Sequence, residues 1–453
     1  MKLHSETYDS YKNAEGEWSE TIPSEWQEKR VKDLFRLVTD AAVADNDYEL
    51  LSLYAGIGVK PRKDLEARGN KASTTDGYWI VRKNDIVVNK LLAWMGSVGL
   101  SEYDGVTSPA YDVLRQVSKD IDPRYFAYLF RTEIAKKIFR KNSRGIMDMR
   151  LRLYFDKLGA ITVPVPLPYQ QVEISDYIEE KIRIIDHKIS RLTILRGKYL
   201  KLRIAVIDKA TILGINGTSD FDVSDIDNIP KIPKGWRTKR LKEIGYLYSG
   251  LAGKKGDDFS EDFDDSMPYI PFTNIANNFF LSLSQVKSVR VGRHEKQNAI
   301  KEGDLFFLMS SEDFADLGKC SVLTDVPSSQ TFLNSFCKGF RLTKKEINPV
   351  YLAYLLHSSP YRINLSNEGK GFTRINLKIE KVNDTKVLIP PKEVQDSIIL
   401  YLNKRTTLID RKVGLIDHLI SKQRELKMAL VYDAVTGKIN IPEKLTEEGT
   451  CHE

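Results

Sequence analysis

The stretch that decides the fold runs from Gln171 to Ile189 and reads QVEISDYIEEKIRIIDHKI. A second copy, QDSIILYLNKRTTLIDRKV, runs from Gln395 to Val413. The two copies share a glutamine at the start and the pairs Tyr177/Tyr401, Ile185/Ile409, Asp186/Asp410 and Lys188/Lys412. Most apolar residues in both copies alternate at steps of four and three, which is typical of a helix that packs against one partner helix.

We expect these two helices to pair through their apolar stripes. The first stripe consists of Ile178, Ile182, Ile185, Ile189 and Leu192, then Tyr199 and Leu202; the second consists of Leu402, Ile409, Val413, Ile416 and Ile420, then Leu430. The narrow stripes favour pairing over the alternative that each helix only covers its neighbouring domain. Prolines precede both helices, and Gly214 and Gly437 follow them, as is common at helix starts and ends.

Two further segments repeat in the same order. Ile22-Pro23-x-x-Trp26 returns as Ile232-Pro233-x-x-Trp236, and Ile121-Asp122-Pro123-x-Tyr125 returns as Ile347-Asn348-Pro349-x-Tyr351. Corresponding residues lie 210 to 226 positions apart across the three repeats. A period this long indicates duplicated domains and not a solenoid.

Each copy begins with a mixed region and ends with a helix. Short apolar runs at residues 78–81, 85–88 and 304–308 alternate with Gly, Asp and Pro turns, and helical stretches follow at about 123–140 and 349–365. The sequence therefore predicts an α+β protein, with two domains of mixed α/β structure joined by two long antiparallel helices in a pseudo-two-fold repeat. We place the first domain at residues 1–167, the first helix region at 168–215, the second domain at 216–390, and the second helix region with its tail at 391–453.

The order of domains and helices along the chain favours antiparallel pairing. The second domain must begin where the first helix ends and end where the second helix begins. Antiparallel helices satisfy both conditions with one domain position. We expect two domains held at a fixed separation and facing opposite ways.

Composition narrows the class of protein. The net charge of +7 suits a nucleic-acid binder with localised basic faces, although many cytosolic proteins share it. Cys320, Cys337 and Cys451 fit neither a metal site nor a disulfide framework, which favours a reducing compartment. Residues 1–20 lack the apolar core of a secretory signal, and no apolar run reaches the length of about 18 residues that a spanning helix needs. We expect a soluble, cytoplasmic protein.

The motifs of common enzyme classes are missing. No glycine stands at the phosphate-loop spacing before any Gly-Lys pair, and no Gly-x-Gly-x-x-Gly turn follows a strand. No Asn-Pro-Pro-aromatic or Asp-Pro-Pro-aromatic tetrad occurs, which an amino-methylating enzyme needs to hold a flipped base. The six histidines lack metal-ligand or triad spacing, and the acidic residues at 257–265 fit a solvated loop better than a cation site. We expect no catalytic centre, no cofactor and no metal in this chain.

Several motifs together resemble the specificity subunits of type I restriction–modification systems, over nearly the full length. They are Tyr11-Lys12 with Glu17-Trp18 and Trp26; Asn89-Lys90 with Trp94-x-Gly96-Ser97 and Ser108-Pro109-Ala110-Tyr111; Pro166-x-Pro168-x-x-Gln171 and Pro390-Pro391-x-x-x-Gln395; and Ala434-Val435-Thr436-Gly437-Lys438. The chain departs from the family pattern where Gln170 and Val394 replace a glutamate. The first helix also ends without the Val-Thr-Gly-Lys form.

The resemblance implies a function. Each domain would read one half of a split DNA sequence, and the helices would set the unread gap. The subunit would assemble with two modification subunits, which methylate adenine with S-adenosylmethionine, and with restriction subunits, which use ATP and Mg²⁺. Two alternatives stay open, a solitary or regulatory DNA-binding protein on the same scaffold and a purely structural coiled-coil adaptor.

Phosphate contacts require Lys and Arg in polar loops. The candidates in the first domain are Lys141, Arg144, Arg150 and Arg152, and the family-like loop adds Lys90 and Trp94. The candidates in the second domain are Lys254, Lys255, Arg290, Arg293, Lys370 and Arg374. Each competes with the alternative of an ordinary solvated residue, and Trp94 with a place in the core.

Overall fold

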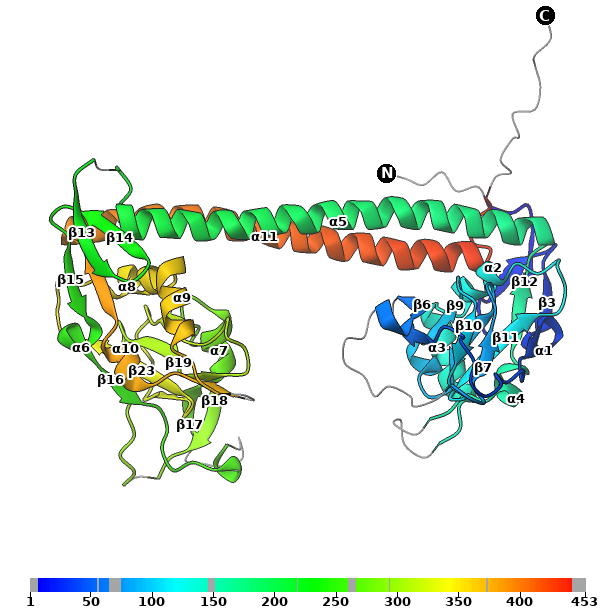
Figure 1. Ribbon diagram of the computed structural model, residues 1–453, viewed down its shortest axis with the longest axis horizontal. Coiled ribbons are helices and arrows are strands. Elements are labelled where there is room, and N and C mark those ends of the chain that lie inside the picture. The colour runs from blue at the N-terminus through cyan, green and yellow to red at the C-terminus, as the bar shows by residue number, and fades with distance from the viewer. Residues whose placement is uncertain are drawn as a thin grey trace, which may run out of the picture. The chain divides into compact units, whose positions relative to one another are not determined.

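The computed structural model describes residues 7–54, 57–64, 75–145, 151–217, 219–259, 266–292, 294–371 and 374–441. The protein has the predicted fold class, with two mixed α/β domains and the long helices α5 (Pro168–Leu213) and α11 (Lys392–Val435) (Figure 1). The chain forms two compact units, residues 1–192 with 418–453 and residues 193–417. Because this division cuts both helices, the domain limits at residues 167 and 390 stay predictions. In the described ranges, no helix is long and apolar enough to cross a membrane.

The first unit contains a four-stranded antiparallel sheet with the strand order β4-β11-β8-β9. Its domain consists of β1 (Tyr11–Asn13), β2 (Thr21–Pro23), β3 (Gln27–Arg30), α1 (Val31–Leu34), β4 (Phe35–Leu37), β5 (Leu51–Tyr54), β6 (Gly58–Pro61), η1 (Arg62–Asp64), β7 (Trp79–Val81), β8 (Ile86–Asn89), η2 (Ala93–Met95), β9 (Val98–Leu100), β10 (Gly105–Thr107), β11 (Tyr111–Gln116), α2 (Pro123–Leu129), α3 (Glu133–Asn142), α4 (Phe155–Leu158) and β12 (Thr162–Val165).

The second unit repeats this sheet in the order β16-β23-β19-β21, again antiparallel. Its domain consists of β13 (Phe221–Ile226), β14 (Ile229–Pro233), β15 (Arg237–Arg240), α6 (Leu241–Ile244), β16 (Gly245–Ser249), η4 (Gly256–Asp258), β17 (Ser266–Ile270), α7 (Phe272–Asn277), β18 (Lys287–Arg290), β19 (Leu305–Leu308), β20 (Ser310–Ser311), β21 (Cys320–Val322), β22 (Phe332–Leu333), β23 (Cys337–Leu342), α8 (Pro349–Leu356), α9 (Ser359–Asn367), β24 (Ile375–Asn376), α10 (Ile379–Asn383) and β25 (Lys386–Ile389).

Each four-stranded sheet contains an ion pair between an arginine and a buried aspartate, at the equivalent place. Arg115 on β11 donates from Nε and NH2 to the two carboxylate oxygens of Asp85, at 2.9 and 2.6 Å. Arg341 on β23 binds Asp304 in the same way, at 2.8 and 2.7 Å. Both aspartates are buried, so two-point pairing with a guanidinium compensates the cost of burying each charge. The sequence pattern indicates these segments only as strands and does not reveal the pairs.

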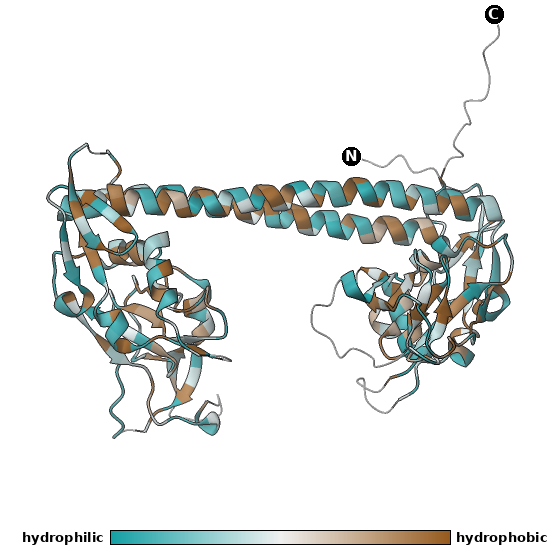
Figure 2. Cartoon of the chain, viewed as in Figure 1, coloured by the Kyte–Doolittle hydropathy of each residue, from teal (hydrophilic) through white to brown (hydrophobic). Residues whose placement is uncertain are grey.

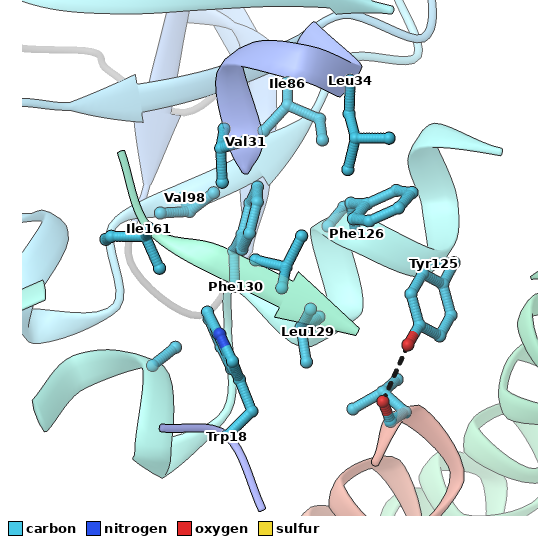
Figure 3. Packing of buried hydrophobic residues seen from close by; sticks show 14 of the residues in the cluster. Trp18, Val31, Leu34, Ile86, Val98, Tyr125, Phe126, Leu129, Phe130 and Ile161 are labelled. Atoms are coloured by element: carbon cyan, nitrogen blue, oxygen red, sulfur yellow. Dashed lines mark hydrogen bonds between the residues drawn. The ribbon is translucent and has the colours of Figure 1, made fainter. Parts of the chain in front are cut away.

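The core of the first domain is rich in aromatic side chains. Trp18, Phe126 and Phe130 pack together with aliphatic residues of the sheet (Figure 3). Asp122 begins α2 by accepting a hydrogen bond from the backbone of Arg124, and Pro123 follows in the first turn. Asn348 does the same for α8 in the second domain. The repeated Ile-Asp/Asn-Pro segment is therefore a helix start.

Each helical stretch predicted after this start is two short helices. Thr132 ends α2 by donating to the Leu129 carbonyl, and its hydroxyl then accepts from the backbone of Ala135 to begin α3. Ser358 bonds the Leu355 carbonyl at the same point of the second domain. A hydroxyl that satisfies the backbone in this way favours a helix boundary over continuation.

The paired helices bury most of the predicted stripe. Figure 2 shows hydrophobic residues alternating with hydrophilic ones along both helices. Buried are Ile178, Ile185, Leu402, Ile409, Ile416, Ile420 and Leu430; partly buried are Ile182, Ile189, Leu192, Tyr199 and Val413. The prediction is wrong at Leu202, which is 43% exposed. The heptad spacing of Ile182 and Ile189 continues at Arg196 and Arg203. In this part of α5, arginines therefore occupy the positions that face the partner helix.

Ion pairs between the helices fix an antiparallel register. In the first unit, Lys427 binds Asp186 at 2.8 Å. In the second unit, Arg196 binds Asp417 at 2.7 Å and Arg203 binds Asp410 at 2.9 Å. In each pair the two residue numbers add up to 613. Charged residues on a seam specify register and orientation in this way.

The pair of Arg203 and Asp410 tests this register. Arg203→Asp places two carboxylates together and should lower the free energy of unfolding by about 1 kcal/mol. Adding Asp410→Arg should restore most of that stability, as measured by denaturant unfolding. Lys201→Asp is the control, because Lys201 is exposed and has no ion pair among the described residues. A double variant no more stable than Arg203→Asp alone would contradict the register.

Candidate nucleic-acid interface

We call the segment from Lys141, in the last turn of α3, to Arg152 the basic loop of the first domain. Arg144 and Arg152 pair through two backbone hydrogen bonds of 2.9 Å, which close the loop. The backbone of Leu153 then donates to the Lys90 carbonyl at the end of β8, also at 2.9 Å. The base of this loop is thus tied to the central sheet. Arg150 lies outside the described residues.

The cations of this loop are paired only at the surface. Lys141 binds Glu17 at 2.7 Å and Arg144 binds Asp156 at 3.2 Å, and all four side chains are more than half exposed. Exposed pairs of this kind contribute at most about 1 kcal/mol, so a phosphate can replace the carboxylate at little cost. These cations are suited to binding an anionic surface.

Lys90 and Trp94 are held more tightly. Lys90 binds Asp112 at 3.3 Å, and its side chain is 21% exposed. Burial raises the pKa of Asp112, and the nearby Lys90 partly opposes that rise. The indole of Trp94 donates to the Leu91 carbonyl at 3.0 Å, and the Arg140 guanidinium lies 5.4 Å from the ring centroid. Both residues support the loop that joins β8 to β9.

The second domain carries a loop at the same place of its fold. The backbones of Lys370 and Asn376 pair after α9, and Leu377 donates to the Met309 carbonyl just beyond β19. Lys370 and Arg374 are exposed on this loop. The Arg374 guanidinium lies 4.8 Å from the ring centroid of Phe336, an exposed aromatic side chain. Candidates that the sequence indicates separately in the two domains therefore belong to equivalent loops.

The other candidates of the second domain belong to two segments that contact each other, because Lys254 binds Glu295 and Ala252 bonds with Gln297. Lys255 and Arg290 are exposed, and Arg293 lies outside the described residues. The Lys254 side chain is only 6% exposed and binds Glu295, whose pKa this contact lowers. Glu295 also accepts a backbone hydrogen bond from Gly292. Lys254 therefore holds its own loop in place and is less available to a phosphate than Lys255 or Arg290.

The repeated motifs meet at the joint between each domain and the helices. In the first unit, the backbone of Asp122 donates to the Gln171 side-chain oxygen at 2.9 Å, and Gln171 Nε2 donates to the Pro166 carbonyl at 2.9 Å. In the second unit, the backbone of Asn348 donates to Gln395 at 2.9 Å, and Gln395 donates to the Pro390 carbonyl at 2.9 Å.

In each joint, a tyrosine of the domain also bonds to the end of the second long helix. The Tyr125 hydroxyl donates to the Val435 carbonyl at the end of α11, at 2.8 Å (Figure 3). The Tyr351 hydroxyl donates to the Thr211 carbonyl near the end of α5, at 3.4 Å. Burial raises the pKa of both tyrosines well above the usual value, so both hydroxyls stay protonated donors.

The repeated tryptophans lie beside the glycines that end the helices. Gly437 has a φ of +71° and Gly214 a φ of +77°, which favour glycine. A Cβ on Gly437 would meet Pro23 at 2.4 Å and Trp26 at 3.1 Å, and one on Gly214 would meet Trp236 at 3.6 Å. Sequence reasoning used these repeats to recognise the duplication but missed that they build the joints.

The structure shows the surroundings of several titratable groups. Among the described residues, no group of three His, Cys, Asp or Glu side chains could hold a metal ion. Burial lowers the pKa of His357 to about 4, and its Nε2 lies 2.6 Å from the Cys320 carbonyl. Cys320 and Cys337 are buried free thiols, and burial raises their pKa to about 12. Such thiols are protonated and unreactive at neutral pH.

Known proteins share this architecture. A family model described as "Type I restriction modification DNA specificity domain" matches residues 23–193 and 233–419. A specificity subunit of the type I restriction enzyme StySPI from Salmonella potsdam is 26% identical over 212 residues, which are 47% of this chain and 45% of that protein. In that alignment the chain spans about half the length of its relative. The MjaIX specificity subunit of Methanocaldococcus jannaschii is 22% identical over an alignment of 472 residues, covering 96% of this chain and 98% of that one.

A solved structure agrees on the fold. A chain from work described as "Structural basis underlying complex assembly and conformational transition of the type I R-M system" superposes with a TM-score of 0.68 at 14% identity, covering 92% of this chain and 99% of that chain. Each segment matched by the family model begins at the Ile-Pro-x-x-Trp region and ends within a long helix. With two copies matched over most of its length, this chain belongs to the family of type I restriction modification DNA specificity domains.

Proposed function

We propose that this chain is the sequence-specific DNA-binding subunit of a type I restriction–modification complex. Each domain reads one half of a bipartite DNA target, and α5 and α11 set the number of base pairs between the halves. The observation that carries this proposal is the exposed basic loop at the same place in both copies of the domain. Duplicated domains with equivalent anion-binding loops suit a target made of two half-sites.

In both domains, phosphate contacts and base contacts come from different side chains. Lys141, Arg144 and Arg152 in the first domain and Lys370 and Arg374 in the second contact phosphates, which position the protein without reading sequence. Side chains that neighbour these cations read base edges in the groove. Arg150 stays a candidate for a DNA contact. Lys255 and Arg290 add phosphate contacts in the second domain. Arg293 stays a candidate for the same role.

The chain contributes no catalytic centre and no cofactor of its own in this proposal. Two modification subunits methylate adenine with S-adenosylmethionine, and restriction subunits supply ATP- and Mg²⁺-dependent cleavage. Support for partner subunits comes from apolar side chains left exposed on the helices. Leu195 and Leu202 on α5 and Leu408 and Leu415 on α11 are all more than 40% exposed. Helices of a partner would bury these side chains, which favours a complex over a solitary DNA-binding protein.

The first-domain loop should govern the salt dependence of DNA binding. Replacing Lys141, Arg144 and Arg152 together with Ala should weaken binding and reduce the slope of log K against log salt by up to about 0.9 for each phosphate that is no longer neutralised. Fluorescence anisotropy with a DNA duplex at several salt concentrations measures the slope. Ala at Lys198, Lys201 and Lys209, which are exposed on α5, makes the same change in charge and serves as control. Equal slopes for the two triple variants would show that the loop does not contact phosphates.

The length of the helices should determine the number of base pairs between the two half-sites. Inserting four residues after Lys198 in α5 and four at the facing position, Leu415 in α11, lengthens each helix by about 6 Å. Since DNA rises about 3.4 Å per base pair, the preferred gap should grow by one or two pairs while both half-site sequences stay the same. The readout is adenine methylation of a site library with varied gaps by the complex with modification subunits.

Two controls accompany the insertion. The same four residues inserted at Val326, which is 72% exposed on the second domain, should leave the gap unchanged. The chain without modification subunits should transfer no label from S-adenosylmethionine to DNA, and robust transfer would place a catalytic centre in this chain. A changed half-site with an unchanged gap would mean that the roles of domains and helices are reversed.

A further inference from the structure

Buried hydrogen bonds fix each domain to two different helices. Gln171 joins the first domain to the start of α5, and Tyr125 joins it to the end of α11. Gln395 and Tyr351 make the corresponding bonds in the second unit, to the start of α11 and the end of α5. Apolar side chains of the same helix ends also pack into each domain core, so these bonds add directional contacts to a packed joint. Two bonds to separate helices restrict rotation of the domain.

The glutamine uses both halves of its amide on backbone groups. Gln171 accepts from the backbone of Asp122, where α2 begins, and donates to the Pro166 carbonyl, between β12 and α5. Its side chain is almost fully buried, so water cannot replace either partner. A non-polar side chain of the same length would leave a buried N–H and a buried C=O unsatisfied.

In each joint, the tyrosine hydroxyl donates a hydrogen bond to a backbone carbonyl in the last turn of a long helix. Val435 is the last residue of α11, and Thr211 lies in the last turn of α5. Their carbonyls are among the last four of each helix, which have no partner within the helix. Both tyrosine rings are fully buried. The Tyr125 hydroxyl also lies 3.3 Å from the Pro164 carbonyl, to which it makes a second donor contact. Replacing either tyrosine with phenylalanine removes the hydroxyl and its bond to the helix end while keeping the ring in the core.

The connection between domain and helix is short. β12 ends at Val165 and α5 begins at Pro168, and β25 ends at Ile389 and α11 begins at Lys392. Two residues in each connection allow the domain to pivot but not to move away. A small rotation about this connection is opposed by the packing of both helix ends against the domain core and by the tyrosine bond to the other helix.

We infer that Gln171, Tyr125, Gln395 and Tyr351 are positioning residues that determine how strictly the length of the gap between half-sites is read. This inference rests on the proposed function. A gap one base pair longer displaces a half-site by about 3.4 Å, so a domain that pivots slightly can read two gap lengths. The four residues lie at the joints, away from the basic loops, and leave the half-site sequences unchanged.

The double variant Tyr125→Phe with Tyr351→Phe tests this inference in the complex with modification subunits. The measured quantity is the ratio of methylation at the preferred gap to methylation at a gap one pair longer. We expect this ratio to fall about fivefold for each hydroxyl removed, which is the usual net effect of losing one donor hydrogen. The preferred bases of both half-sites should not change.

Tyr128→Phe is the matched control, because Tyr128 lies one turn along in α2 and its hydroxyl has no hydrogen bond among the described residues. Gln171→Met and Gln395→Met provide a second pair of variants, and their thermal unfolding is measured alongside. A lower unfolding temperature with unchanged gap selectivity would make these residues merely structural and overturn the inference. Loss of half-site preference would overturn it as well. A wild-type complex that methylates no bipartite site would instead refute the proposed function.

Discussion

The antiparallel pairing of α5 and α11 is the constraint on which the rest of the structure depends. Apolar residues supply the attraction between the helices, and the arginines and Lys427 that replace them at stripe positions select one register. Arg203 pairs with Asp410 in the second unit and Lys427 with Asp186 in the first. A shift of either helix by one turn would separate both pairs. Each domain contacts the start of one helix and the end of the other, so both joints form only in this register.

Duplication explains which features recur and which do not. The buried pairs of Asp85 with Arg115 and of Asp304 with Arg341 recur because both sheets need the same two-point contact. The joints recur because both domains meet the helices in the same way. The basic loops recur in position but not in sequence, as is expected where the two domains bind different half-sites. Structural conservation within the chain thus separates the scaffold from the surface that we propose reads DNA.

Local patterns in the sequence predicted the scaffold well. Heptad spacing, proline and glycine punctuation and the three repeats gave both helices and the duplicated mixed domains. Sequence reasoning assigns Leu202 to the stripe because it is an apolar residue one position before Arg203. Spacing alone cannot show that the stripe position is occupied by Arg203 and its ion pair with Asp410. The split of each helical stretch at Thr132 and Ser358 depends on a hydroxyl bond that a helical pattern does not reveal.

The candidate interface was less accessible to sequence reasoning. A run of basic residues indicates exposure only on average, and Lys254 is buried against Glu295, which lies far along the chain. The equivalence of the loops around Arg144 and Lys370 became visible only from the strands to which they are tied. The joint was missed because tryptophan, tyrosine and glutamine repeats look like core residues, and their partners lie on a helix distant in sequence.

Mapping methylated adenines in the DNA of cells that carry the complete system tests the central claim most directly. If each domain reads one half-site and the helices set the gap, the map should show one bipartite motif, with two constant half-sites separated by an unread gap of fixed length. One methylated adenine should lie in each half-site, on opposite strands. A single continuous motif, or two half-sites separated by gaps of many lengths, would mean that the domains and helices do not have these roles.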